Sequence, residues 1–296
     1  MLKLEGCFTA LVTPFKGGRP DLKALRSLVA FQIANGADGL VPCGSTGEAA
    51  TLSPEEYLDV IRTVVDEAGG KLPVMPGVGT NSTARSAEMA KKVSALGVDG
   101  LLAIVPYYNK PTQAGLKAHF GELAGATRLP VVLYNIPGRT GVNMLPATVL
   151  ALAKEFSNII GIKEASGVLD QASEIVNGAP EGFAVMSGDD SLTLPMMAVG
   201  ARGVVSVVSN IAPAQVSRMC ELFRKGQPGE AAAMHHRLFP LVKNLFVETN
   251  PIPVKYAVSL LRLCGPEPRL PLTPLAAKLR PGLRAAMLKA GIKLPS

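Results

Sequence analysis

Short apolar runs alternate with amphipathic stretches along most of the chain, and this alternation predicts strands followed by helices. In the clearest amphipathic stretch, apolar residues recur every three to four positions from Tyr57 to Val65. Ser53, Pro54 and Glu56, just before it, have the spacing of a helix N-cap, a first-turn proline and a capping box. A helix is therefore predicted to begin at Pro54.

A short glycine motif recurs where helical stretches give way to apolar runs. Its copies are NGADGL (35–40), LGVDGL (96–101) and VGARGV (199–204). The first glycine of each copy is predicted to take the left-handed conformation that ends a helix. The spacing of the copies fits units of roughly 30 residues, the size of one strand plus one helix.

At this pitch the chain contains eight apolar, β-rich runs. They are Gly6–Val12, Gly39–Pro42, Pro73–Pro76, Leu101–Val105, Val131–Asn135, Ile159–Lys163, Phe183–Met186 and Gly203–Val207. Eight alternating units with continuously apolar strands predict an α/β fold, a closed (β/α)8 TIM barrel. A doubly wound open sheet is the alternative, but no GxGxxG motif follows the first strand.

The alternation stops after about Phe223. Segments 229–247, 252–263 and 273–292 have helical patterns, with proline and glycine between them. We expect residues 1–223 to form the barrel and residues 224–296 to form a C-terminal helical extension packed on it.

Composition narrows the class of protein. A hydrophobic content of 48% with 18% charged residues is typical of a globular chain. The net charge of +7 is spread out and aromatic residues make up only 5%, so we expect no nucleic-acid surface. No apolar run reaches the roughly 18 residues that a membrane span needs, and we expect no membrane association.

The N-terminal residues show no signal-peptide pattern, and the four cysteines lack CxxC or Cys/His spacing. We therefore expect a cytoplasmic protein with reduced thiols and no structural zinc.

Lys163 ends an apolar run, although a buried ammonium is disfavoured inside a parallel sheet. In TIM barrels the active site lies at the C-terminal ends of the strands. Burial lowers the pKa of an amine, and a neutral lysine attacks ketones and aldehydes to form a Schiff base. The alternative is that Lys163 reaches solvent or pairs with the adjacent Glu164, and this stretch alone leaves both open.

Other predicted strand ends carry polar groups suited to an α-keto acid. Tyr134 is expected beside Lys163, where a phenol can move the protons that imine formation requires. In GSTGE (44–48), Ser45 and Glu48 have capping-box spacing, and the turn's N–H groups can receive a carboxylate. Arg139 offers a bidentate fork for a second carboxylate. Each residue alone has an ordinary structural explanation, but together they favour an α-keto-acid site.

These motifs resemble the dihydrodipicolinate synthase family, within the pyruvate-dependent class I aldolases that include N-acetylneuraminate lyase. The resemblance runs nearly end to end, through LVTPF (11–15), GSTGE (44–48), PYYNKP (106–111), YNIPGRTG (134–141), GIKEASG (161–167), SGDD (187–190), GVVSV (203–207) and NPIPVKYA (250–257).

The resemblance implies a lyase of lysine biosynthesis by the diaminopimelate route. Lys163 would form a Schiff base with pyruvate, whose enamine attacks L-aspartate 4-semialdehyde before cyclisation to 4-hydroxy-tetrahydrodipicolinate. Tyr134 would transfer protons, with Ser45 and with Tyr108 from a neighbouring subunit completing its relay. Substrate contacts would come from Thr46, Val205, Arg139, Gly188 and Asp189. The resemblance implies no cofactor or metal, and a homotetramer built as a dimer of dimers.

Two departures from the family pattern stand out. Position 45 is serine where the family usually has threonine, although the hydroxyl is kept. Lysine-inhibited members present histidine and glutamate at a dimer-interface site, which matches Ala50, Pro54, Tyr57, Asn81, Arg85 and Tyr107 here. Because arginine replaces an acidic residue that would bind an ammonium group, we expect weak or absent inhibition by lysine.

Two alternatives remain open. A 2-keto-3-deoxy-sugar-acid aldolase or an N-acetylneuraminate lyase would share Lys163 and Tyr134, although Arg139 favours a short substrate with its own carboxylate. A catalytically silent barrel that serves as a binding or scaffold protein would not need Lys163, Tyr134 and the hydroxyls of the GSTGE turn.

Overall fold

The computed structural model describes residues 2–295, and eight of its strands form one sheet with helices outside it, a TIM-barrel fold. The order of the strands is β4 (Gly39–Val41), β1 (Gly6–Ala10), β10 (Gly203–Ser206), β9 (Ala184–Ser187), β8 (Ile159–Glu164), β7 (Val131–Asn135), β6 (Leu101–Ile104) and β5 (Gly77–Val78). The pairs β4–β1 and β10–β9, and each pair from β9 to β5, are parallel, and the predicted (β/α)8 barrel is confirmed.

Seven of the eight predicted strands overlap the observed ones, and the third is displaced. It was expected at Pro73–Pro76, but β5 begins at Gly77, and Val74 makes only an isolated bridge with Leu40. The two prolines lack the N–H group that a ladder hydrogen bond requires, so regular pairing begins only after Pro76.

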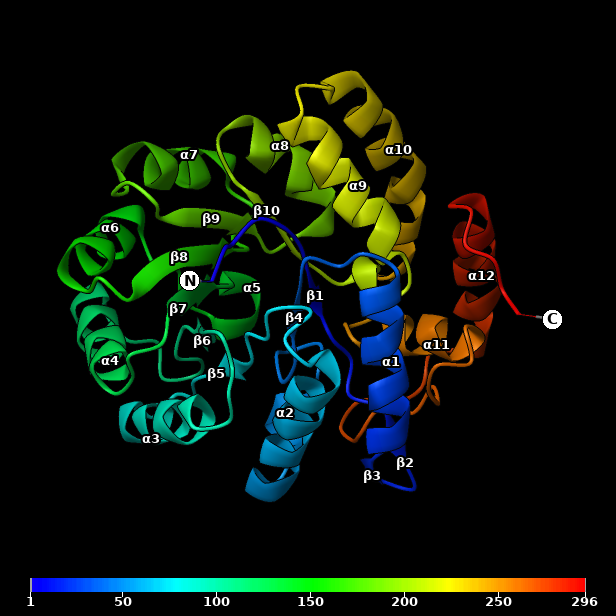
Figure 1. Cartoon of the computed structure of the whole chain (residues 1–296), viewed down its shortest axis with the longest axis horizontal. Helices are drawn as coiled ribbons and strands as arrows, with labels where there is room; N and C mark the ends of the chain where they lie inside the picture. Colours follow the sequence, from blue (N-terminus) through cyan, green and yellow to red (C-terminus); the bar gives the residue numbers. More distant parts are fainter. Residues whose placement is uncertain (1, 296) are drawn as a thin grey trace. The chain divides into compact units, whose positions relative to one another are not determined.

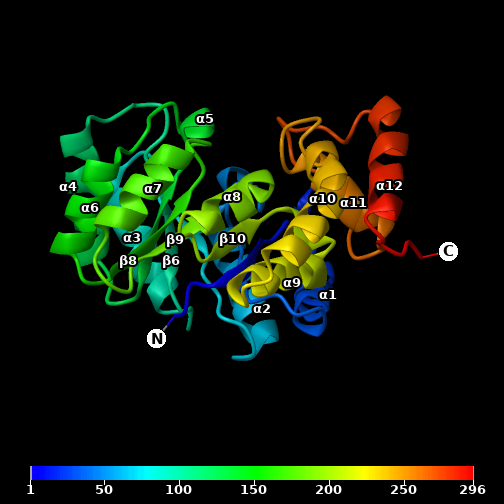
Figure 2. The same cartoon turned by 90° about the horizontal axis from the view of Figure 1, so that it is seen from above.

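The chain divides into two units, one formed by residues up to 6 with 75–205 and the other by 7–74 with 206 onward. The helices of the first unit are α3 (Thr83–Ser94), α4 (Gln113–Gly125), α5 (Pro137–Thr140), α6 (Pro146–Glu155), α7 (Leu169–Gly178) and α8 (Thr193–Ala198), with the 3-10 helix η2 (Asp190–Leu192). Figures 1 and 2 show α4, α6 and α7 outside β7, β8 and β9. These strands are covered on both faces, which explains their continuous apolar sequences.

The second unit contains the first two helices of the chain and its last four. Its helices are α1 (Leu22–Ala34), α2 (Pro54–Ala68), α9 (Pro213–Arg224), α10 (Pro228–Asn244), α11 (Ile252–Leu260) and α12 (Arg280–Lys289). The shorter elements are the hairpin β2 (Phe15–Lys16) and β3 (Arg19–Pro20), and the 3-10 helices η1 (Ala49–Thr51), η3 (Val208–Asn210) and η4 (Ala277–Leu279). The last helix was expected from residue 273, but Pro271 and Pro274 precede it and α12 begins at Arg280.

Local signals in the sequence set several element ends. The capping box of Ser53 and Glu56 is formed, with Pro54 at the first position of α2. Gly36, Gly97 and Gly200 take positive φ angles of 70°, 77° and 108°, as the repeated glycine motif predicts.

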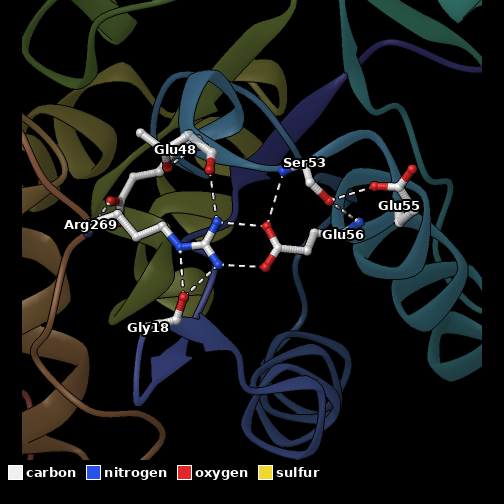
Figure 3. A network of polar contacts seen from close by, with 7 residues as sticks. Gly18, Glu48, Ser53, Glu55, Glu56 and Arg269 are labelled. Carbon is white, nitrogen blue, oxygen red and sulfur yellow. Dashed lines mark hydrogen bonds and ion pairs between the residues drawn. The ribbon is translucent and has the colours of Figure 1, made fainter.

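Arg269 ties the C-terminal segment to the chain around α2 (Figure 3). Its guanidinium binds the two carboxylate oxygens of Glu56 at 2.6 and 2.5 Å, and donates to the carbonyl oxygen of Gly18. Its backbone N–H donates to Oε2 of Glu48 at 2.8 Å. The hydrogen bonds from Arg269 hold the pKa of Glu56 at about 2, well below its ordinary value of 4.5.

Candidate active site

Lys163 and Tyr134 lie opposite each other on neighbouring strands. The register pairs Tyr134 of β7 with Lys163 of β8. The Lys163 Nζ lies 4.1 Å from the centroid of the Tyr134 ring, and the two residues are only 6% and 5% exposed. The structure therefore brings together the two residues that the sequence placed at adjacent strand ends, and buries both.

Glu164 does not pair with Lys163, so that alternative interpretation of the lysine is wrong. Successive side chains of a strand point to opposite faces. The Glu164 carboxylate accepts hydrogen bonds from the Ser166 N–H at 2.6 Å, Gln171 Nε2 at 2.9 Å and Asn135 Nδ2 at 3.1 Å. Within residues 2–295, Lys163 has no carboxylate partner at ion-pair distance.

A second buried lysine shows what an ion-paired lysine looks like in this chain. Lys255 is fully buried, and its Nζ lies 2.6 Å from Oε1 of Glu48 and 4.1 Å from the centroid of the Phe15 ring. Burial lowers the pKa of Lys255, and the Glu48 carboxylate opposes that shift. Lys255 is thus engaged in an ion pair, whereas Lys163 is buried against a phenol ring.

Gly188 leaves room beside the lysine side chain. A Cβ added at this position would lie 3.1 Å from Lys163 Cε and 2.6 Å from the Cβ of Ala165. The next residue, Asp189, accepts hydrogen bonds from the N–H and Oγ of Ser191, both at 2.8 Å, and so caps η2. The structure therefore places Gly188 at Lys163 and gives the Asp189 carboxylate a local structural partner.

The remaining predicted residues of the first unit differ in exposure. Val205 lies on β10 and is buried, whereas Arg139 lies on α5 with its side chain exposed. Tyr108 is 88% exposed, with a φ of 73° that non-glycine residues seldom adopt. Its N–H donates to the Thr140 carbonyl at 3.4 Å, which ties this loop to the end of α5.

The GSTGE turn, in the second unit, is held by long-range hydrogen bonds. Thr46 is 4% exposed, and its hydroxyl accepts a hydrogen bond of 2.9 Å from Asn250 Nδ2, while Ser45 is half-buried. The turn leads into η1. The predicted capping box of Ser45 and Glu48 is wrong, because the Glu48 carboxylate binds Lys255 and the Arg269 N–H instead.

The six residues matched to the lysine site divide between the units. Ala50, Pro54 and Tyr57 belong to the second unit, and Asn81, Arg85 and Tyr107 to the first. Ala50, Pro54 and Arg85 are exposed, Tyr107 is 37% exposed, and Asn81 is half-buried. Tyr57 is 7% exposed, and burial raises the pKa of its phenol. The side chain of Tyr57 thus lies on the buried face of α2.

The sequence did not predict several of the chain's buried polar residues. They are Asn135, Gln171, Asn250 and Lys255, and the outward-facing carboxylate of Glu164. Asn135 and Glu164 directly follow Tyr134 and Lys163, but Asn135 had no predicted role and Glu164 only that of a partner of Lys163. For Asn135 and Glu164 the available signal was a polar residue at the end of an otherwise apolar strand.

The fold is a TIM barrel with a lysine and a tyrosine buried side by side on neighbouring strands. The model of the dihydrodipicolinate synthetase family matches residues 3–290. The chain belongs to the dihydrodipicolinate synthetase family, a family of lyases.

Individual relatives match over nearly their whole length. The 4-hydroxy-tetrahydrodipicolinate synthase of Pelobacter propionicus is 49% identical over 288 residues, 97% of this chain and 99% of the relative. The structure of dihydrodipicolinate synthase from Aquifex aeolicus has a TM-score of 0.97 at 43% identity, covering 99% of this chain and 100% of that one. The Cyanidioschyzon merolae enzyme with lysine bound has a TM-score of 0.95 at 45% identity, covering 98% and 99%.

Residues 2–295 contain neither a cluster of metal ligands nor a membrane-spanning helix. No group of three or more His, Cys, Asp and Glu side chains there could hold a metal ion. No helix in the same range has both the length and the hydropathy to cross a bilayer.

Proposed function

We propose that this chain condenses pyruvate with L-aspartate 4-semialdehyde to form 4-hydroxy-tetrahydrodipicolinate, in the diaminopimelate route to lysine. One observation carries the proposal. Lys163 is buried at the C-terminal end of β8 without a carboxylate partner among the described residues, and its amine lies against Tyr134. An amine without a carboxylate partner at the end of a barrel strand supports this proposal, because the neutral amine is the nucleophile that a Schiff base requires.

The proposed reaction uses the lysine as a covalent carrier and needs no cofactor. The amine adds to the keto carbon of pyruvate, and loss of water from the carbinolamine gives the imine. Loss of a methyl proton then gives the enamine, whose carbon attacks the aldehyde of the second substrate. Attack of that substrate's amino group on the imine carbon closes the ring and releases Lys163. Tyr134 is proposed to donate and accept the protons of these steps.

The other site residues take their proposed roles from the family resemblance. Ser45 and Tyr108 would complete the proton relay of Tyr134, and Thr46 and Val205 would contact pyruvate. Arg139 would bind the semialdehyde carboxylate, and its exposed guanidinium supports a role in capturing an incoming anion.

Gly188 and Asp189 would line the same mouth. The space that Gly188 leaves beside Lys163 Cε supports its part in this arrangement.

We propose that the working form is a homotetramer, a dimer of dimers, in the cytoplasm. Tyr108 supports an assembly, because a tyrosine that is 88% exposed in one chain is available to a second copy. We further propose that lysine inhibits this enzyme weakly or not at all. The exposed Arg85 places a positive charge where the family's lysine-inhibited members bind the ligand's ammonium group.

The activity is tested by initial rates in three assays, one condensation and two cleavages. Condensation with aspartate 4-semialdehyde is compared with cleavage of sialic acid and of 2-keto-3-deoxygluconate. We expect turnover only with the semialdehyde, and we expect Lys163→Ala to lower kcat by on the order of 10³-fold or more while remaining folded. Faster turnover of either sugar acid would assign the chain to another pyruvate-dependent aldolase.

A further inference from the structure

Strands β7 and β8 carry two consecutive polar rungs at their C-terminal ends. Tyr134 pairs with Lys163 in the first rung, and Asn135 pairs with Glu164 in the second. Because side chains alternate along a strand, the second rung faces away from the first. Asn135 is fully buried and Glu164 is 2% exposed, so both lie between the sheet and the helices outside it.

The Glu164 carboxylate is held entirely by neutral donors. Asn135 Nδ2 lies 3.1 Å from its Oε2, Gln171 Nε2 of α7 lies 2.9 Å from Oε2, and the Ser166 N–H lies 2.6 Å from Oε1. Within residues 2–295 no cation is at ion-pair distance from it. A buried carboxylate costs folding free energy unless such hydrogen bonds replace its hydration.

Asn135 is fixed by further hydrogen bonds. Its Oδ1 accepts from the Met144 N–H at 3.0 Å, and its Nδ2 also donates to Asn143 Oδ1 at 2.7 Å. The amide therefore sits between the Glu164 carboxylate on β8 and the segment that leads into α6. This arrangement leaves the Asn135 side chain little freedom to rotate.

The ladder between β7 and β8 is irregular at the end opposite this pair. Its register shifts between Val131 and Val132, so regular pairing is interrupted at the N-terminal end of the two strands. The backbone ladder and the hydrogen bond between Asn135 and Glu164 then set the spacing of the opposite end.

We infer that Asn135 and Glu164 form a positioning pair, which holds Lys163 and Tyr134 at their mutual distance from the outer face of the sheet. The inference rests on the proposed function, because it concerns the geometry of Schiff-base formation. Proton transfer from Tyr134 to the carbinolamine depends on close alignment of the reacting groups, and a displacement of about 1 Å costs on the order of 10²-fold in rate.

The pair is tested by exchanging its two side chains. Glu164→Gln keeps one acceptor oxygen and sets its amide hydrogens against at least one of the three donors, and Asn135→Asp sets two carboxylates against each other. The double variant N135D/E164Q restores one donor and one acceptor in reverse order. The rate of reductive labelling of Lys163 by pyruvate and borohydride is measured for each, with kcat and KM in the condensation assay.

Thr148→Val is the matched control. Its hydroxyl is buried and donates to Gln113 Oε1 at 2.6 Å, joining α6 to α4 in the same unit. The variant therefore removes a buried hydrogen bond of similar length and leaves in place the bond from Gln113 Nε2 to the Asn143 carbonyl oxygen, which adjoins the pair.

We expect each single variant to label Lys163 and turn over about 10- to 100-fold more slowly, with a smaller change in KM for pyruvate. The double variant should recover to within about threefold of the wild type, and Thr148→Val should match the wild type. A changed pH optimum with no loss of rate at that optimum would assign Glu164 an electrostatic role and overturn the positioning pair.

Two further outcomes overturn the inference. The first is that the single variants are labelled at the wild-type rate. The second is that the double variant folds but is labelled as slowly as the single variants. If the single variants do not fold, Gln171→Met must slow labelling for the inference to stand. This variant removes the donor from α7 to Glu164 together with the hydrogen bonds of Gln171 to Asn143 and Met144. A wild-type enzyme that is not labelled at all would overturn the proposed function, whereas labelled wild type with unaffected variants overturns only the pair.

Discussion

At the scale of single residues, two buried lysines show how partners decide the use of an amine. Lys255 has the Glu48 carboxylate at 2.6 Å and serves as a structural cation, whereas Lys163 lies over the ring of Tyr134. The sequence predicted a functional role for Lys163, because a lysine at the end of an apolar strand departs from the pattern around it. It did not predict a role for Lys255, whose partner is 207 residues away and leaves no local signal.

The prediction on inhibition by lysine depends on Arg85. Millimolar L-lysine should change the initial rate by less than about twofold, because the exposed guanidinium repels the ligand's ammonium group. Arg85→Glu provides the comparison, since it restores an acidic side chain and should increase sensitivity. Strong inhibition of the wild-type enzyme would show that Arg85 does not control the response.

At the scale of elements, the strands and helix ends with local signals were predictable. Val131–Asn135 was predicted and observed with identical bounds, because a strand covered on both faces is apolar throughout. The third strand was misplaced because its hydrophobic run contains two prolines. The capping box of Glu48 was wrong because a distant lysine competes for the carboxylate, which local spacing cannot reveal.

The bond between Arg269 and Glu56 joins the C-terminal segment to α2 and should depend on pH. Glu56 has a folded pKa of about 2 against an ordinary value of 4.5, so its stabilising contribution is complete above pH 4.5 and disappears as pH falls towards 2. Arg269→Met should therefore lower the free energy of unfolding by about 1–2 kcal/mol near neutral pH, and by progressively less below pH 4.5.

Denaturant unfolding across this pH range measures the effect. Lys225→Met is the control, because it breaks the exposed ion pair with Glu221 on α9 and should not measurably change stability. An Arg269→Met effect of the same size at pH 7 and pH 2.5 would mean that the Glu56 carboxylate is not its source.

At the scale of the whole molecule, the order of the chain does not follow its structural units. The unit that contains α1 and α2 also contains the helices after residue 206, and the lysine and tyrosine belong to the other unit. The alternation of strands and helices predicted the TIM barrel. Which distant segments share hydrogen bonds, as Thr46 and Asn250 do, could not be predicted from periodicity. We retain the division into a barrel of residues 1–223 and an extension of residues 224–296 as a proposal.

The central claim is that the Lys163 amine is the nucleophile that captures pyruvate. Its most direct measurement is treatment of the intact enzyme with pyruvate and borohydride, followed by peptide mass mapping. One reduced pyruvyl group should appear on the peptide containing Lys163, and it should be absent without pyruvate and in Lys163→Ala. An unmodified Lys163 peptide, or a pyruvate-dependent adduct on a different lysine, would contradict the claim.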